Sequence, residues 1–241
     1  MQEPSVLYED NDVVAINKPA GLVVHSDGKT KEANLVDWLV ENYPKIKDVG
    51  EPGRDSHGNE ILRSGIVHRL DRGTSGVMLI AKTKESFESL KKQFQNHKIQ
   101  KKYEAFVFGE VRADGVVDRP IGRSSSDFRK WSAQRGARGE MRDAVTEYRV
   151  LTKNKDFSLI ELSPKTGRTH QIRVHMKAIN HPLVGDSLYA PNREMSLGFN
   201  RVALHSKEIT FTGLDGTTHT VSAPYPEDFQ NAMKLINSER D

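Results

Sequence analysis

Strand patterns outnumber helix patterns in this chain of 241 residues, and the two kinds do not alternate. We expect about eight strands and four helices from the spacing of the apolar residues. A doubly wound parallel sheet would require strands and helices in strict alternation. The mixed order instead predicts an α+β fold with a mixed, largely antiparallel sheet and flanking helices. No repeat, low-complexity tract or linker is present, so residues 1–241 are predicted to form a single domain.

The individual elements follow from apolar runs, alternation and capping residues. Strands are predicted at 13–16, 77–81, 103–111, 146–151, 157–162, 209–212 and 218–222, the last four as two hairpins. Helices are predicted at 35–43 after the cap Asn34, at 84–99, at 169–179 after the cap Thr169, and after Pro226. The polar residues 44–64 contain Pro52, Gly53 and Gly58 and are interpreted as a mobile loop.

Composition excludes several classes of protein. The chain has no cysteine, which rules out disulfides, thiolate nucleophiles and cysteine-containing zinc sites. Mean hydropathy is −0.63, and no apolar run approaches the roughly 20 residues of a membrane span. The first residues lack the basic and apolar segments of a signal peptide. We therefore expect a cytoplasmic protein that does not bind membranes, and a monomer.

The net charge of +3 conceals three basic segments. Residues 82–102 carry seven lysines against two glutamates, residues 119–142 carry seven cations against two acids, and residues 165–177 carry four cations and no acid. Lysines on a helix are often no more than its solvated face. The second segment also interleaves Phe128 and Trp131 with its arginines and has the glycine and serine content of a loop. This combination favours contact with RNA phosphates and bases.

A polar turn at 65–76 lies between an apolar pair and the strand expected at 77–81. Its carboxylate, Asp71, has a histidine and two arginines within three positions, and such loops commonly carry reactive groups. An aspartate that merely supports the turn at Gly73 is the alternative interpretation.

A second cluster, 166–175, surrounds the start of the helix expected from Thr169. Arg173 and the backbone N–H groups of this turn could bind an anion, either an RNA phosphate or the Asp71 carboxylate. His170 and His175 are five residues apart, whereas two metal ligands on a helix are usually four apart, so we expect them to lie at the surface or to serve hydrogen-bonded packing.

Four ordered blocks resemble the RluA-type pseudouridine synthases. The blocks are Asn17–His25, His68–Asp71 (HRLD) followed by Thr74–Gly76, Lys102–Ala105, and Thr166–His175 followed by His181–Pro182 and Gly185–Asp186. They cover roughly residues 7–226. The S4-type RNA-binding domain of many relatives is not found before the first block, so the chain resembles the short members of the family.

The resemblance implies the pseudouridine synthase catalytic fold and a role for each matching residue. Asp71 would be the catalytic aspartate, Tyr103 would stack on the target uracil, and Arg173 would pair with Asp71. Arg69 would enter the RNA helix and help to displace the target nucleotide. RNA contacts are further expected from His68, Lys102, Arg123, Lys130 and Arg168.

The implied reaction isomerises specific uridines in structured RNA, either rRNA, tRNA or both. Nothing is oxidised and no group is imported, so it requires no cofactor and no metal. It does require an ionised carboxylate, which could attack C1′, attack C6 or abstract a sugar proton. A catalytically silent RNA-binding or RNA-folding module is the main alternative. A carboxylate-driven hydrolase is less favoured, since it would usually need a second catalytic carboxylate.

Overall fold

The computed structural model describes residues 2–25, 32–51, 53–54, 58, 60–61, 63–125, 127–134 and 137–238. The chain divides into two compact units, each made of two separate stretches. The first unit comprises Met1–Gln100 and Ser206–Pro224, and the second comprises Lys101–His205 and Tyr225–Asp241. Among the described residues, nine strands belong to the main sheet, five of them wholly or mainly in the first unit, and the fold is α+β as predicted.

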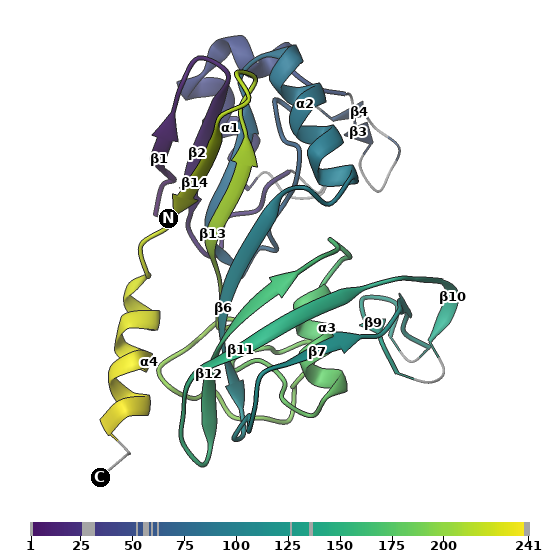
Figure 1. Ribbon diagram of the computed structural model, residues 1–241, viewed down its shortest axis with the longest axis vertical. Helices are drawn as coiled ribbons and strands as arrows, with labels where there is room; N and C mark the ends of the chain where they lie inside the picture. The colour runs from purple at the N-terminus through teal and green to yellow at the C-terminus, as the bar shows by residue number, and fades with distance from the viewer. Residues whose placement is uncertain are drawn as a thin grey trace. The chain divides into compact units, whose positions relative to one another are not determined.

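The first unit contains one end of this sheet (Figure 1). Its strands are β1 (Ser5–Glu9), β2 (Val13–Lys18), β5 (Ser75–Ala81), β13 (Leu204–Thr212, in this unit from Ser206) and β14 (Thr218–Ser222). Their order is β1-β2-β5-β13, and β14 pairs with β13. The β1–β2, β2–β5 and β13–β14 pairs are antiparallel. All seven residues of β5 are buried, as expected for its continuous apolar run.

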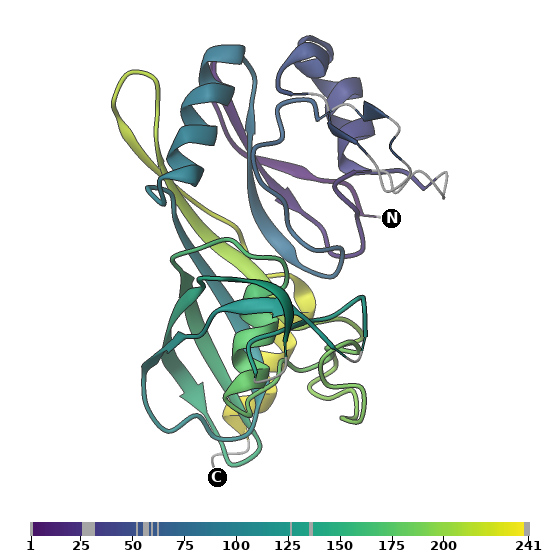
Figure 2. The same cartoon turned by 90° about the vertical axis from the view of Figure 1, so that its right-hand side faces the viewer.

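Two helices accompany these strands: α1 (Leu35–Asn42) and α2 (Lys84–Gln95). Asn34 caps α1 with its side chain, as predicted, and Asp37 completes a capping box. Figure 2 shows α2 beside the β13–β14 hairpin, where the side chain of Gln93 exchanges two hydrogen bonds with the backbone of Thr212. Thus the helix is anchored to a strand more than one hundred residues away in sequence.

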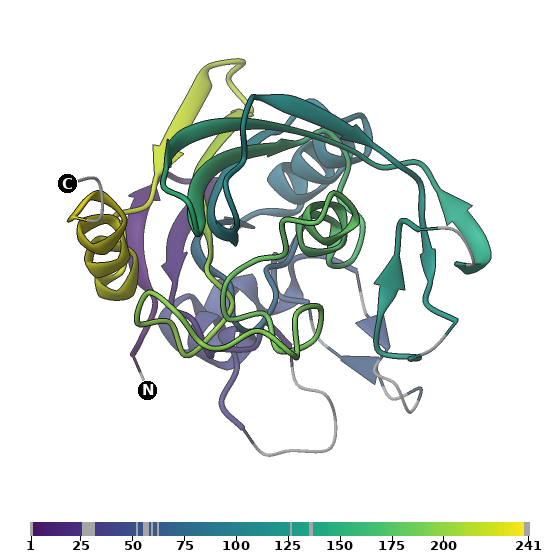
Figure 3. The same ribbon diagram turned by 90° about the horizontal axis from the view of Figure 1, so that it is seen from below.

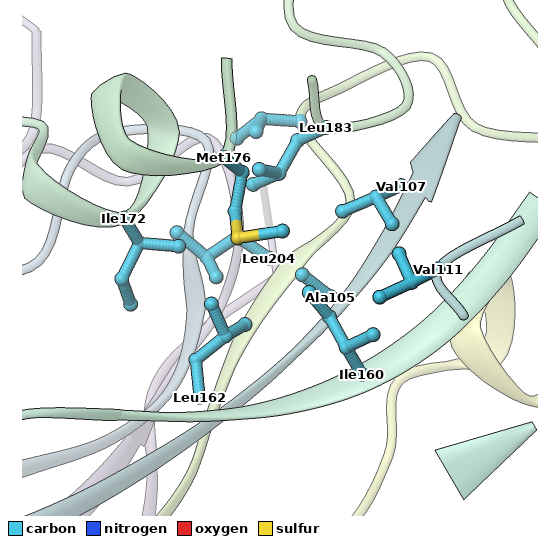
Figure 4. Close-up of a cluster of buried hydrophobic side chains, with 10 residues drawn as sticks. Ala105, Val107, Val111, Ile160, Leu162, Ile172, Met176, Leu183 and Leu204 are labelled. Atoms are coloured by element: carbon cyan, nitrogen blue, oxygen red, sulfur yellow. The ribbon is translucent and has the colours of Figure 1, made fainter. Parts of the chain in front are cut away.

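The second unit contains β6 (Gln100–Phe108), β7 (Gly115–Asp118), β11 (Val145–Lys153) and β12 (Phe157–Pro164), in the order β6-β12-β11-β7. Figure 3 shows α3 (Gln171–Ala178) inside the curve of these strands. Alternate residues of β6 serve two cores. Ala105 and Val107 face the cluster that contains Ile172 and Met176 of α3 (Figure 4). Phe106 and Phe108 face the cluster that contains residues of α4 (Glu227–Ser238).

The residues between β7 and β11 form a separate three-stranded sheet. It consists of β8 (Ile121–Arg123), β9 (Trp131–Ser132) and β10 (Arg138–Arg142) in the order β10-β8-β9, and we call residues 121–142 the arm. All five residues of β10 are exposed. The prediction of a loop at 119–142 is therefore wrong in part. Pairing between strands that are separate in the sequence forms a sheet that composition alone does not reveal.

Three further local predictions were wrong. Residues 44–64 were expected to be a loop, but Pro44–Asp48 form a 3₁₀ helix and β3 (Gly53–Arg54) pairs with β4 (Glu60–Ile61). Residues 52, 55–57, 59 and 62 of that segment lie outside the described residues. Helix α2 ends at Gln95 rather than at residue 99, since His97 has a φ of 56° that a helix cannot continue. Helix α3 begins at Gln171, because His170 has a φ of 57°.

Candidate active site

The turn that carries Asp71 is fixed at both ends by backbone hydrogen bonds. The carbonyl of Gly65 accepts from the N–H of Ala81, and the N–H of Thr74 donates to the carbonyl of Asp71 at 3.0 Å. Gly65 has a φ of 76°, and a Cβ there would lie 2.1 Å from the Ala81 oxygen, so only glycine fits. Asp71 is half-buried within this held turn.

A buried lysine supports the same turn. Lys18 at the end of β2 is 0% exposed. Its Nζ donates to the carbonyl oxygens of Pro19 at 2.9 Å and Leu22 at 2.8 Å, and lies 3.4 Å from that of Arg72. The Arg72 carbonyl also accepts from the N–H of Gly21 at 2.8 Å. Lys18 therefore joins the 19–22 segment to the residue that follows Asp71.

His68 is neutral in this arrangement. Its Nε2 accepts a hydrogen bond from the N–H of Leu79 at 2.9 Å, which requires that nitrogen to carry no proton. Its ring stacks on Phe94 of α2 with centroids 4.6 Å apart. While this bond is present, His68 adds no positive charge near Asp71, and an RNA contact from His68 stays a prediction.

The two arginines around Asp71 differ in their surroundings. Arg69 is exposed, as a residue that enters an RNA helix must be. Arg72 forms a bidentate ion pair with Glu32, at 2.8 and 2.7 Å. Arg72 therefore has a carboxylate partner within its own unit.

Arg173 lies on α3 of the second unit and pairs with a buried carboxylate. Its Nε donates to Oδ2 of Asp186 at 2.7 Å and its Nη2 to Oδ1 at 2.8 Å. Asp186 also accepts from the N–H groups of Leu188 and Tyr189, so it supports the turn that follows it. Asp71 belongs to the first unit and Arg173 to the second, and the pairing of these two residues stays a prediction.

Tyr103 is a partly buried residue of β6 that packs against the core cluster beneath α3. Glu104, its neighbour, points to the opposite face of the strand, where its carboxylate accepts from the Tyr225 hydroxyl at 2.9 Å. Lys101 shares the face of Tyr103, as residues two apart on a strand do. Burial lowers the pKa of Lys101 to about 8, and its Nζ donates to the Thr166 carbonyl at 3.3 Å. Lys102 is partly buried.

The turn before α3 is held by a side chain that the sequence did not single out. Gln171 is buried and accepts from the Thr166 hydroxyl at 2.7 Å and from the N–H of Arg168 at 3.0 Å. Its amide donates to Val145 and Thr146 of β11. Arg168 itself donates through Nε to the carbonyl of Asp143. Thus the turn is built by a glutamine, where a helix cap at Thr169 was expected.

The arm contains the other predicted RNA contacts. The Arg123 guanidinium lies over the Trp131 ring, 4.3 Å from its centroid, and donates to the Phe128 carbonyl. Phe128 is 85% exposed. The Nζ of Lys130 lies 3.8 Å from Oδ2 of Asp127, and the same carboxylate pairs with Arg129. Arg135 lies outside the described residues.

The two histidines of the second cluster are hydrogen-bonded within the second unit. His175 is fully buried between the Thr146 hydroxyl and the Arg119 carbonyl, and burial lowers its pKa. His170 hydrogen-bonds the Tyr189 hydroxyl. Within the described residues, no group of three potential metal ligands occurs and no helix is long and apolar enough to cross a membrane.

A family model described as RNA pseudouridylate synthase matches residues 12–178. The chain belongs to the RNA pseudouridine synthase family. This synthase is 37% identical to "Ribosomal large subunit pseudouridine synthase D" of Zymomonas mobilis, over 96% of this chain and 72% of that protein. It is 39% identical to "Uncharacterized RNA pseudouridine synthase YlyB" of Bacillus subtilis, over 96% of this chain and 72% of that protein.

A solved structure, "Human RNA Pseudouridylate Synthase Domain Containing 4", has 26% identity and a TM-score of 0.74, covering 96% of this chain and 92% of the human one. These likenesses confirm both the family resemblance and the fold class inferred from the sequence. The synthase is accordingly an isomerase that acts on RNA.

Sequence reasoning missed Gln171 and Tyr189, two buried residues that hydrogen-bond Arg168 and His170 before α3. Neither residue type is unusual, and each gains its importance from burial. A weak signal existed for Gln171, since it follows the basic turn and could reach back to it. None existed for Tyr189, which acts on residues 16 and 58 positions earlier in the chain.

Proposed function

We propose that this synthase converts specific uridines of structured RNA to pseudouridine with Asp71 as the catalytic aspartate. Ribosomal RNA is the favoured target, since several relatives are named for the large ribosomal subunit, and tRNA is an additional candidate. The observation that carries the proposal is the Asp71 turn, a half-buried carboxylate in a loop fixed by Thr74, Gly21 and Lys18. Residues 1–241 would act together as one catalytic domain and as a monomer.

Each demand of the reaction has a candidate residue. Isomerisation breaks the N1–C1′ bond, turns the uracil and rejoins it through C5. Asp71 would act as an ionised carboxylate on C1′, on C6 or on a sugar proton. Arg173 would stabilise that ionised form by pairing with it. Tyr103 would stack on the uracil and keep water from the sugar.

The RNA must release the target nucleotide from its stack, which costs a few kcal/mol. Arg69 would enter the helix to displace it. Contacts from Arg123, Lys130, Arg168, Lys102 and His68 would offset that cost. The exposed position of Arg69 and the stack of Arg123 on Trp131 support these roles.

The test is release of tritium from RNA labelled at uracil C5. We expect wild-type protein to release tritium and Asp71→Asn to bind RNA normally but release none. Asp48→Asn removes an exposed carboxylate outside the site and serves as the matched control. Normal release by Asp71→Asn would remove Asp71 from its proposed role. Tyr103→Phe should bind RNA and turn over more slowly.

The alternative, a catalytically silent RNA-binding module, is distinguished by the same assay. It predicts salt-dependent RNA binding without tritium release by the wild-type protein. The intact HRLD turn and its buried supports argue against it, because a silent module would not need an aspartate fixed in this way.

A further inference from the structure

One aromatic side chain contacts three elements of the second unit. Tyr189 follows the turn at Asp186 and is 3% exposed. Its hydroxyl accepts a hydrogen bond from the backbone N–H of Trp131 in the arm at 3.0 Å. The same hydroxyl hydrogen-bonds Nδ1 of His170, the residue before α3, at 2.8 Å.

The ring of Tyr189 supports the predicted active-site arginine. The Cζ atom of Arg173 lies 5.0 Å from the ring centroid, within the range of a cation–π interaction. Lys177, one helical turn later, has its Nζ 5.8 Å from the same centroid. The Asp186 carboxylate binds the Arg173 guanidinium through both oxygens, and its Oδ1 also accepts from the backbone N–H of Tyr189. The Arg173 guanidinium is thus held by the Asp186 carboxylate and by the Tyr189 ring, and both residues belong to the same turn.

We propose that Tyr189 is a positioning residue for the pseudouridylation reaction, acting through Arg173. It would hold the guanidinium through its ring and hold both the start of α3 and the arm through its hydroxyl. This inference rests on the proposed function, because it assumes that Arg173 assists catalysis.

The burial of Tyr189 explains why it would not act on RNA directly. At 3% exposure it offers almost no surface to a substrate. Its core neighbours are Ile121, the first residue of the arm, Ala144, two residues after the arm, and Val174 of α3. A change in Tyr189 should therefore alter the placement of Arg173 without removing an RNA contact.

Two substitutions of Tyr189 distinguish the effect of its ring from the effect of its hydroxyl. Tyr189→Phe keeps the ring under Arg173 and removes the hydrogen bonds to His170 and Trp131. Tyr189→Leu removes both. Tyr148→Phe removes a hydroxyl elsewhere in the second unit and is the matched control. Thermal unfolding identifies any variant that fails to fold, and Tyr189→Phe, the milder change, then carries the test.

The experiment measures the single-turnover rate of tritium release with saturating enzyme, and the RNA dissociation constant in parallel. We expect Tyr189→Leu to lower the rate at least tenfold and Tyr189→Phe to lower it less, with the dissociation constant within threefold of wild type. Tyr148→Phe should match wild type. A rate loss explained wholly by weaker RNA binding would overturn the proposal.

A double-mutant cycle tests whether the effect passes through Arg173. In an Arg173→Lys background, we expect each Tyr189 substitution to lower the rate less than threefold, because the guanidinium that Tyr189 supports is already absent. Equal fold losses in both backgrounds would show a merely structural role and overturn the proposal. A wild-type protein that releases no tritium would instead overturn the proposed function, and this inference with it.

Discussion

The ammonium of Lys18 lies 3.4 Å from the carbonyl oxygen of Arg72, the residue that follows Asp71. Since Lys18 is fully buried and also donates to Pro19 and Leu22, it fixes the proposed catalytic turn from within the core. A buried lysine is costly unless its donors are satisfied, and here backbone carbonyls satisfy them.

Replacing Lys18 should destabilise the protein. Lys18→Met keeps the length of the side chain but leaves at least two buried carbonyls without a donor, at about 1–3 kcal/mol each. We expect the free energy of unfolding to fall by about 2–4 kcal/mol, measured by urea denaturation. Lys84→Met, at an exposed position of α2, should change it by less than about 0.5 kcal/mol. Equal effects of the two substitutions would contradict the anchoring role.

Gly76 should tolerate no side chain. It has a φ of +111°, and a Cβ there would lie 2.2 Å from the Ser206 carbonyl oxygen. We expect Gly76→Ala to lower the free energy of unfolding by more than about 3 kcal/mol, from overpacking and backbone strain together. Gly216 has a φ of +83°, and a Cβ there would meet no atom within 4 Å, so Gly216→Ala should cost about 1–2 kcal/mol of strain only. Chemical denaturation of both variants measures the difference.

Acid should destabilise the folded protein through a fully buried histidine, His175, and a partly buried one, His25. Burial lowers the pKa of His175, and burial together with Arg63 and Arg69 lowers that of His25 to about 4. Below the unfolded value of about 6.5, the unfolded chain binds protons that the folded chain does not, so stability falls as pH decreases. Each histidine should contribute a slope of up to about 1.4 kcal/mol per pH unit. Between pH 7 and 5, the free energy of unfolding should depend less steeply on pH in His25→Gln than in the wild-type protein. An unchanged slope would refute the contribution of His25.

Phe128 should contribute to RNA affinity. An aromatic side chain that is 85% exposed beside Arg123 and Arg129 can stack on an unpaired base, an interaction of about 1–3 kcal/mol. We expect Phe128→Ala to weaken RNA binding about tenfold, measured by filter binding at fixed salt. Val116 is 60% exposed on β7, and Val116→Ala should leave affinity unchanged. Loss of affinity in both variants alike would argue against a specific stack.

Much of the fold could be predicted because its signals are local. The Asn34 cap, the apolar run of β5 and the alternation of β11 and β12 each lie within a dozen residues. Errors arise at single left-handed residues, His97 and His170, and where residues apart in the sequence decide the structure. The three strands of the arm pair only after residues 121–142 come together, and the turn before α3 is held by Gln171, whose side chain also reaches β11.

The same distinction holds for the candidate site. Asp71, Tyr103 and Arg173 could be proposed from motifs, because their residue types and spacing resemble those of a family. Their supports could not, because Lys18 and Tyr189 matter through burial and through partners far along the chain. A sequence pattern shows which groups are reactive more readily than it shows what holds them in place.

The division of the first unit into two stretches determines when it can be completed during synthesis. Strand β5, which directly follows the Asp71 turn, gains its second neighbour only with β13, after the whole of residues 101–205 has been made. All four sheet strands of the second unit have by then been translated. In a nascent chain, the edge of β5 that pairs with β13 is therefore the later of its two edges to be completed. A chain truncated before residue 206 would have the Asp71 turn and β5 but would lack most of β13.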